Sequence, residues 1–236
     1  AAFQRTNYRA DRCAVAVGGS FEPEAVLQQL ELGPVGELPS AMVSPFQPRG
    51  LAVQPGRHQL RLPRLESARL LMLWSAPPAA SQQQLSGLDL LTTVLAEGRS
   101  SRLVRRLREE LQLVESIDLE LHPLEDGSLV VLEAVCEASQ LDAVIHEVEE
   151  LLVQAAAGVS PAELERSRRL LDHGHRFSLE AIGPVTQLLG QSTLTGRMQG
   201  FDAPLQRLAS WNCDALQPLA KALDPSLACV LEVRPL

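Results

Sequence analysis

The fold of this chain is set by Ile117-Asp118-Leu119-Glu120-Leu121-His122, which Asp126-Gly127 separates from Leu129-Val130-Val131-Leu132-Glu133-Ala134-Val135-Cys136. In the first run apolar side chains alternate with charged or polar ones, and a period of two is typical of a strand with one buried face. Asp-Gly is a favoured turn between antiparallel strands. The stretch therefore predicts a β-hairpin.

Two helices are expected before this hairpin. The first opens at Ser81, which with Gln84 has the spacing of a capping box, and it ends near Gly98. The second covers 103–111, where apolar residues recur at the spacing of a regular 3.6-residue turn.

Helices also follow the hairpin. The stretch 141–152 carries one apolar stripe that ends at Gly158. Ser160-Pro161-Ala162-Glu163 then supplies an N-cap, a first-turn proline and an acidic third residue, so a long helix should begin there. Gly183-Pro184 interrupts it, and further helical stretches lead to a last strand at 227–233.

Two more strands, at 58–62 and 68–74, come before the first helix. Helices clustered between hairpins favour an α+β fold, with an antiparallel sheet that has helices packed on one face. A strand and a helix at 13–30 and a linker at 33–56, rich in Gly and Pro, come before this domain. The expected division is therefore 1–32, 33–56 and 57–236.

Composition excludes several classes of function. A formal net charge of −8 and 3% aromatic residues argue against a nucleic-acid surface, and no apolar run is long enough to cross a membrane. The four cysteines form no CxxC pair, which favours a reducing compartment. The start, Ala1-Ala2-Phe3-Gln4-Arg5, indicates a fragment of a longer protein, so localisation stays open between the cytoplasm, which we favour, and the periplasm.

No metal or catalytic motif is complete. His173 and His175 are two residues apart and cannot share one helix face, and His146-Glu147-Val148-Glu149-Glu150 lacks the second histidine of an H-x-x-E-H zinc motif. The sequence has no G-x-S-x-G elbow and no phosphate-binding glycine loop. A Cys–His nucleophile pair stays open, without local support.

Five arginines make a locally basic segment in this acidic chain: Arg99, Arg102, Arg105, Arg106 and Arg108. As a helix surface they would pair at i,i+4, Arg105 with Glu109 and Arg106 with Glu110. As a binding site they would take an anion, in an otherwise unrelated α+β protein.

The same segment resembles the signature of the non-catalytic domain of the M16 family of zinc peptidases, which includes pitrilysin and the mitochondrial processing peptidase. The matching residues are Leu95, Gly98, Ser100-Ser101-Arg102-Leu103, Leu107-Arg108-Glu109 and Leu113. Three flanking stretches are similar to the family's landmarks in the same order: 14–24, 158–166 and 230–235.

The resemblance implies a chain that carries no catalytic residue and no zinc site of its own. M16 proteins pair similarly folded domains around an unfolded peptide, and zinc sits in the first domain, on an H-x-x-E-H helix. Zinc is therefore expected only in a partner domain or subunit. The expected partners are another M16-type domain, in a homo- or heterodimer, and an extended peptide, with residues 1–32 completing a preceding domain.

In active relatives this type of domain supplies an arginine and, seven residues later, a tyrosine that hold the substrate. Arg108 matches the arginine, and we predict Arg108 and Arg102 as substrate-binding residues. Glu115 stands at the tyrosine position and Gln112 replaces the usual glycine. Glu115 cannot donate the phenolic hydrogen bond and could pair with Arg108 or another arginine instead.

Two explanations of Glu115 stay open. The chain belongs to the zinc-bearing subunit of a split peptidase, or the whole protein has become a non-enzymatic scaffold or assembly partner. In the first case the chain is part of a zinc-dependent endopeptidase, although it is not an enzyme alone.

Overall fold

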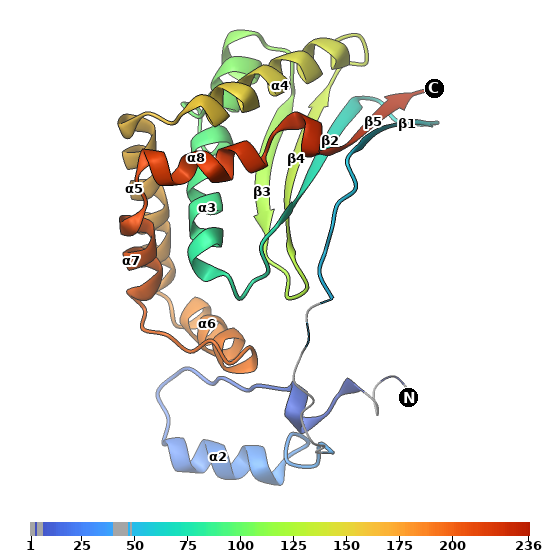
Figure 1. Cartoon of the computed structure of the whole chain (residues 1–236). Coiled ribbons are helices and arrows are strands. Elements are labelled where there is room, and N and C mark those ends of the chain that lie inside the picture. Colours follow the sequence, from blue (N-terminus) through green and yellow to red (C-terminus); the bar gives the residue numbers. More distant parts are fainter. Residues whose placement is uncertain (1–2, 4–6, 40–46, 48) are drawn as a thin grey trace. The chain divides into compact units, whose positions relative to one another are not determined.

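The computed structural model describes residues 3, 7–39, 47 and 49–236 (Figure 1). The chain divides into two compact units. One comprises Ala1–Phe46 and His173–Ala203, and the other comprises Gln47–Asp172 and Pro204–Leu236. One boundary falls inside the expected linker at 33–56, of which residues 40–46 and 48 lie outside the described residues. The grouping of His173–Ala203 with the N-terminal segment has no counterpart in the sequence pattern.

The second unit is built on a five-stranded sheet in the order β1-β5-β2-β4-β3. The strands are β1 (Gly56–Leu62), β2 (Ala68–Ala76), β3 (Ser116–His122), β4 (Ser128–Cys136) and β5 (Cys229–Pro235). β3 and β4 form the predicted hairpin, and β2 pairs antiparallel with both β4 and β5.

The pairing of β1 with β5 is parallel, so the expectation of an entirely antiparallel sheet is wrong at this edge. β5 reaches the sheet only after a long run of helices, and such a connection can return a strand in either direction. The α+β fold class is confirmed, but the sheet is mixed.

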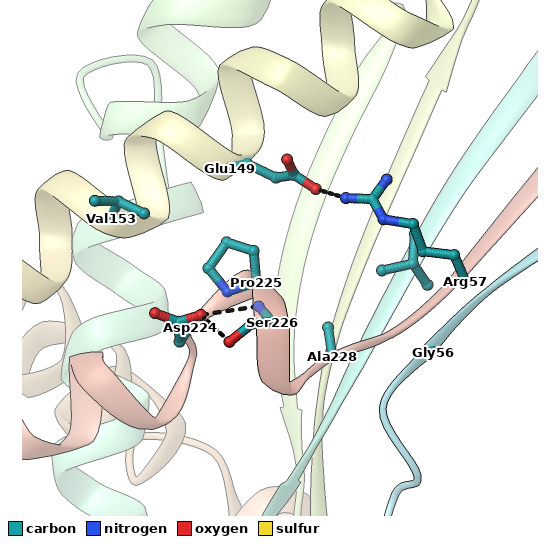
Figure 2. Close-up of a pocket in the computed structure, with 9 residues that line it drawn as sticks. Gly56, Arg57, Glu149, Val153, Asp224, Pro225, Ser226 and Ala228 are labelled. Carbon is teal, nitrogen blue, oxygen red and sulfur yellow. Dashed lines mark hydrogen bonds and ion pairs between the residues drawn. The ribbon is translucent and has the colours of Figure 1, made fainter.

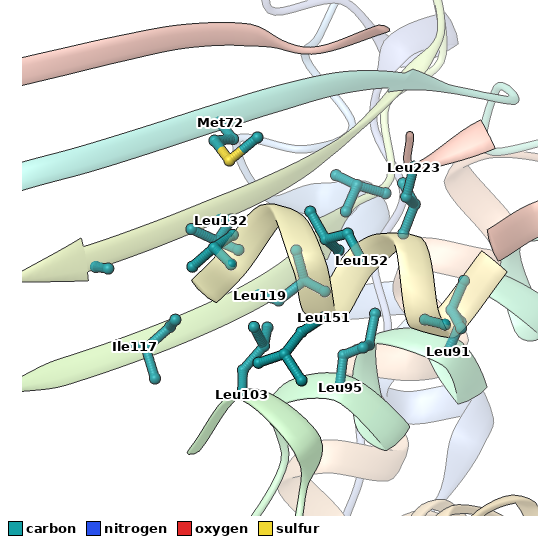
Figure 3. Close-up of a cluster of buried hydrophobic side chains, with 14 of the residues drawn as sticks. Met72, Leu91, Leu95, Leu103, Ile117, Leu119, Leu132, Leu151, Leu152 and Leu223 are labelled. Carbon is teal, nitrogen blue, oxygen red and sulfur yellow. The ribbon is translucent and has the colours of Figure 1, made fainter. Parts of the chain in front are cut away.

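Helices pack on one face of this sheet. The helices in contact with the sheet are α3 (Gln82–Ala96) and α4 (Leu141–Ala157), and α8 (Cys213–Ala222) packs on both of them. α5 (Pro161–Ser178) and α7 (Ala203–Ser210) contribute Leu164 and Leu208 to the same core. Leu91 and Leu95 from α3 meet Leu152 from α4 and Leu132 from β4 in the core shown in Figure 3. Each fully buried leucine contributes roughly 1.5–3 kcal/mol of transfer free energy. This packing fixes the positions of the segment after α3 and of the start of α5, which carry the candidate site.

The opposite face of the sheet, called here the open face, is only partly buried and is mixed, because apolar side chains share it with Arg69, Glu133 and the exposed carboxylates Asp118 and Glu120. Along β2, side chains on the core side are buried, whereas Leu71 and Leu73 are half-buried. The register places Leu231 of β5 and Val131 of β4 beside them, with Leu60 and Leu62 of β1 (43% and 38% exposed) at the edge of the same face.

Both predicted helix starts are confirmed, but their caps differ. At α5, Ser160 N–H donates to Glu163 Oε2 at 2.9 Å and Glu163 N–H donates to Ser160 Oγ at 3.3 Å, so the predicted N-cap is confirmed. α3 begins at Gln82, directly after Ser81, but the capping box predicted there is not formed. Ser81 makes no side-chain cap, because its backbone (φ −82°, ψ 53°) is not in the extended region that a capping residue needs.

The first unit contains a 3₁₀ turn (Ala10–Arg12), α2 (Pro23–Leu32) and α6 (Ile182–Leu194). The helix predicted after residue 20 is confirmed as α2, but the strand predicted at Cys13–Val17 is not formed within the described residues. A strand needs a hydrogen-bonded neighbour. Val15 and Val17 are about half exposed (48% and 47%), and α2 buries no residue.

None of the helices in the described part of the chain is both long and apolar enough to cross a membrane.

Candidate functional site

The arginine-rich segment forms a π-helix, Val104–Glu110, instead of the predicted regular α-helix. Leu111 N–H donates to Arg106 O at 3.0 Å, five residues back. Val104 and Leu107 keep the segment anchored in the core. π-Turns are rare and occur frequently at functional sites.

The chain leaves the π-helix through Gln112, whose φ is +53°. This is the left-handed region, which glycine occupies without steric cost. The family signature has glycine at this position, so the backbone geometry expected of the family persists here although the residue has changed.

Glu109 is held between two arginines. Arg99 donates from Nε and Nη2 to Glu109 Oε2 at 3.2 and 2.6 Å. Arg108 donates from Nε and Nη2 to Glu109 Oε1 at 3.1 and 3.0 Å. Hydrogen bonds from Arg99 and then Arg108 lower the pKa of Glu109 below its ordinary value. Glu109 is therefore a fixed anion beside Arg108.

Arg108, the first predicted substrate-binding residue, is accessible, with 41% of its side chain exposed. Within the described part of the chain, its hydrogen bonds leave from Nε and Nη2 alone. The Nη1 edge of the guanidinium faces no acceptor there, so it is available to a ligand.

Arg102, the second predicted substrate-binding residue, has a different setting. Its Nε and Nη2 donate to Glu163 Oε1 and Oε2 at 2.6 and 2.8 Å, and Nη2 also reaches Gly158 O at 2.9 Å. This bidentate contact, with the help of Ser160, lowers the pKa of Glu163 to about 2. Arg102 ties the arginine-rich segment to the start of α5.

The other two arginines are also paired. Arg106 donates to both carboxylate oxygens of Glu147 in α4, at 2.8 and 3.2 Å. The predicted Arg106–Glu110 pair is present at 3.6 Å, whereas Arg105 lies 3.4 Å from Glu110 and not beside Glu109. The extra residue in the π-turn shifts this partner by one position. Each of the five arginines is paired with a glutamate, which argues against a simple anion-binding patch.

Glu115, at the tyrosine position of the signature, accepts a hydrogen bond from Ser67 Oγ at 2.9 Å. Arg108 bonds to Glu109 instead, so of the two pairings left open for Glu115, with Arg108 or with another arginine, the first does not form. A carboxylate in this setting supplies no donor to a substrate.

The described residues do not fit a zinc ion. Among them, no group of three or more His, Cys, Asp or Glu side chains gathers closely enough to hold a metal. In α4, His146 lies 3.5 Å from Glu150, and both are more than half exposed. His175 Nε2 is hydrogen-bonded to Phe201 O at 2.7 Å.

A groove that the sequence does not predict lies between β1 and α4 (Figure 2). Its volume is about 470 Å³, and its lining includes Gly56, Val153, Asp224 and Pro225. An ion pair between Arg57 of β1 and Glu149 of α4 crosses it. Asp224 accepts from Ser226 N–H and Oγ, which fixes one wall. Its polar groups are paired within the protein.

Comparisons with a family model and with sequence relatives both indicate a zinc-peptidase family. Residues 1–171 match the family model described as the peptidase M16 inactive domain. An uncharacterized zinc protease of Streptomyces coelicolor is 26% identical over 242 residues, covering 97% of this chain and 52% of the relative.

Solved structures share the fold. The peptidase M16 inactive domain from Pseudomonas fluorescens superposes with a TM-score of 0.76 at 15% identity, covering 90% of this chain and 50% of that one. A protease from Helicobacter pylori gives a TM-score of 0.74 at 19% identity, covering 92% of this chain and 54% of that one. The chain thus spans about half the length of the relatives it matches.

Proposed function

Because this chain belongs to the peptidase M16 family, as an inactive domain, we propose that it is the non-catalytic part of a zinc-dependent M16-type endopeptidase. In this proposal it forms a wall of the peptide chamber and an interface with another M16-type domain or subunit. The relatives with matching sequences carry the name zinc protease and are about twice as long as this chain. Their length supports the proposal that this chain acts together with a second M16-type domain or subunit.

The observation that carries the wall proposal is the open face of the sheet. Leu60 and Leu62 of β1 expose apolar surface in register with Val233 and Pro235 of β5, and the half-buried Leu231 is diagonal to Leu60 on the same face. Contiguous exposed apolar surface marks an interaction site. An extended peptide has both apolar side chains and backbone groups to place against such a sheet.

Arg108 is the residue proposed to contact the peptide directly. Its exposed guanidinium presents Nη1 donors that suit a backbone carbonyl or carboxylate oxygen. Arg102 would contribute through Nη1 as well, since Glu163 and Gly158 occupy its other donors. The zinc and the groups that activate water would come from the partner domain or subunit, because the described residues of this chain do not fit the metal.

The N-terminal segment is proposed to complete a preceding domain of the same fold. Val15 and Val17 alternate in an extended segment that lacks a strand partner among the described residues, and α2 follows it without a buried face. An unpaired extended segment and an uncovered helix both gain stability from a sheet to join.

Binding of fluorescein-labelled casein, an unfolded polypeptide, to the full-length protein tests the wall proposal through fluorescence anisotropy. Changing Leu60 and Leu62 together to Lys should weaken binding at least about fivefold, because two apolar contacts are lost. The matched control is Leu170→Lys, an equally exposed leucine on α5 (43%). Equal casein affinities for the parent protein, the Leu60 and Leu62 double variant and Leu170→Lys would refute the proposal that this chain forms a wall of the peptide chamber.

A second candidate function is a non-enzymatic scaffold on the same fold, and Glu115 favours it because it removes the donor that active relatives use. The two functions differ in metal content. An endopeptidase requires zinc bound to the full-length protein and casein hydrolysis that a chelator abolishes, whereas a scaffold binds its partner domain without either property.

A further inference from the structure

We infer that Glu109 and Arg99 are positioning residues that hold the Arg108 guanidinium in the orientation in which it meets a peptide. This inference rests on the proposed peptide contact of Arg108. Neither Glu109 nor Arg99 would itself touch the peptide.

The π-turn makes the first contact possible. In a regular α-helix, neighbours in sequence point to different sides and do not face each other. Between Val104 and Glu110 each turn contains an extra residue, so neighbours diverge less. Arg108 Nε and Nη2 both lie within 3.1 Å of Glu109 Oε1.

The second contact, from Arg99 to Glu109, fixes the other oxygen of the carboxylate. A carboxylate beside an arginine usually takes two parallel hydrogen bonds with both oxygens. Here Oε2 is occupied by Arg99 Nε and Nη2, so only Oε1 is left for Arg108. Arg99 thereby fixes the carboxylate of Glu109 from its other oxygen and holds Oε1 toward Arg108.

The donor count shows which edge stays available. A guanidinium has five N–H donors. Glu109 takes the Nε–H and one Nη2–H of Arg108. The Nη1 group and the second Nη2–H form a planar edge, and this edge matches the acceptor oxygens of a peptide. The two positioning residues hold that edge in one direction and reduce the rotamer entropy lost on binding.

The test compares four variants of the full-length protein by fluorescence anisotropy with labelled casein: Arg108→Gln, Glu109→Gln, Arg99→Gln and, as control, Glu110→Gln. Glu110 is the matched control because its partners are Arg105 and Arg106. Arg108→Gln should weaken binding about tenfold, as expected for loss of charged hydrogen bonds. Glu109→Gln and Arg99→Gln should each weaken it severalfold, and Glu110→Gln should not change it.

A double-mutant comparison separates positioning from a general structural role. Adding Glu109→Gln or Arg99→Gln to Arg108→Gln should cause no further loss, because nothing is left to orient. A further loss in that background would show a structural effect and overturn the inference.

Two other results of the binding test distinguish the positioning role from the peptide contact. Weaker binding by Arg108→Gln with unchanged or tighter binding by Glu109→Gln and Arg99→Gln overturns the positioning role and leaves the peptide contact intact. Unchanged binding by Arg108→Gln overturns the peptide contact itself, and the positioning role with it. Urea unfolding of each variant checks that the fold is retained.

Discussion

The indole ring of Trp211 lies against the backbone of Gly87, so close that a Cβ on Gly87 would stand 2.5 Å from Trp211 Cζ2. Trp211 Nε1 also donates to Ser86 Oγ at 3.0 Å, which keeps the ring on α3. Leu219 of α8 approaches the same position to 2.6 Å. The absence of a side chain at residue 87 therefore allows the segment before α8, and α8 itself, to pack on α3.

Gly87→Ala should lower the free energy of unfolding by about 1–3 kcal/mol, because the added methyl group overpacks this contact. Helix propensity alone would favour alanine by about 1 kcal/mol. Gly174→Ala in α5 is the matched control, since no atom lies within 4 Å of its added Cβ, and it should be neutral or stabilising. Urea unfolding monitored by circular dichroism measures both. Stabilisation by Gly87→Ala would contradict the close approach.

Arg166 of α5 caps the end of α3. Its Nη1 donates to Glu97 O at 3.0 Å, and its Nη2 donates to Thr93 O at 3.2 Å and Val94 O at 3.4 Å, in the last turn of the helix, where carbonyls run out of intrahelical donors. Thr93 O also accepts from Glu97 N–H at 3.2 Å. Arg166→Met should destabilise the chain by about 1–3 kcal/mol. Arg169→Met, which removes a mostly exposed arginine from the same helix, should change stability by less than about 0.5 kcal/mol. Equal urea midpoints for the two variants would count against the cap.

The elements that sequence predicts here are those with a local period. The hairpin at 117–136 and α4 were predicted because their side chains repeat every two or 3.6 residues. The insertion of β5 between β1 and β2 depends on long-range pairing, which leaves no local pattern. The strand expected at Cys13–Val17 is not formed for the same reason, since the run is apolar but has no strand partner among the residues that the structure describes.

The candidate site, like the fold, could be predicted only where the sequence carries a local pattern. Resemblance to a signature located Arg108, but the spacing of 103–111 equally suits a regular helix and hides the π-turn. Because the π-turn decides which glutamate meets which arginine, Glu109 could not be recognised as the partner of both Arg99 and Arg108. The bond from Arg102 to Glu163, 61 residues along the chain, follows from the tertiary fold and leaves no local pattern.

Gln112→Gly should stabilise the chain by about 0.5–1 kcal/mol. The left-handed backbone at Gln112 (φ +53°) costs a residue with a Cβ about 1–2 kcal/mol. Glycine removes that cost but adds roughly 0.4–1 kcal/mol of unfolded-state entropy, so part of the gain is cancelled. Gln112→Ala keeps the Cβ and is the control, for which no stabilisation is expected. Thermal unfolding of the two variants gives the comparison, and a less stable Gln112→Gly would contradict it.

Ionisation of Glu163 should make the free energy of unfolding depend on pH. Its pKa is about 2 in the folded chain, mainly through Arg102, against about 4.3 for an unfolded glutamate. A lowered folded-state pKa contributes stability that is fully present above about pH 4.3 and is lost as pH falls towards 2. With 27% of the side chain exposed, solvent screening reduces this contribution to about 2 kcal/mol.

Glu163→Gln isolates this contribution. The variant removes the carboxylate, so the difference in unfolding free energy between it and the parent chain should be about 2 kcal/mol at pH 6 and should shrink as pH falls through 4 to 3. Glu165→Gln, two residues along α5 and half exposed, provides a control whose difference should stay small throughout. Urea titrations at each pH measure the two differences. A Glu163 difference that does not vary between pH 6 and pH 3 would mean that Arg102 does not bind the ionised form preferentially, and the Arg102–Glu163 contact would then act through packing alone.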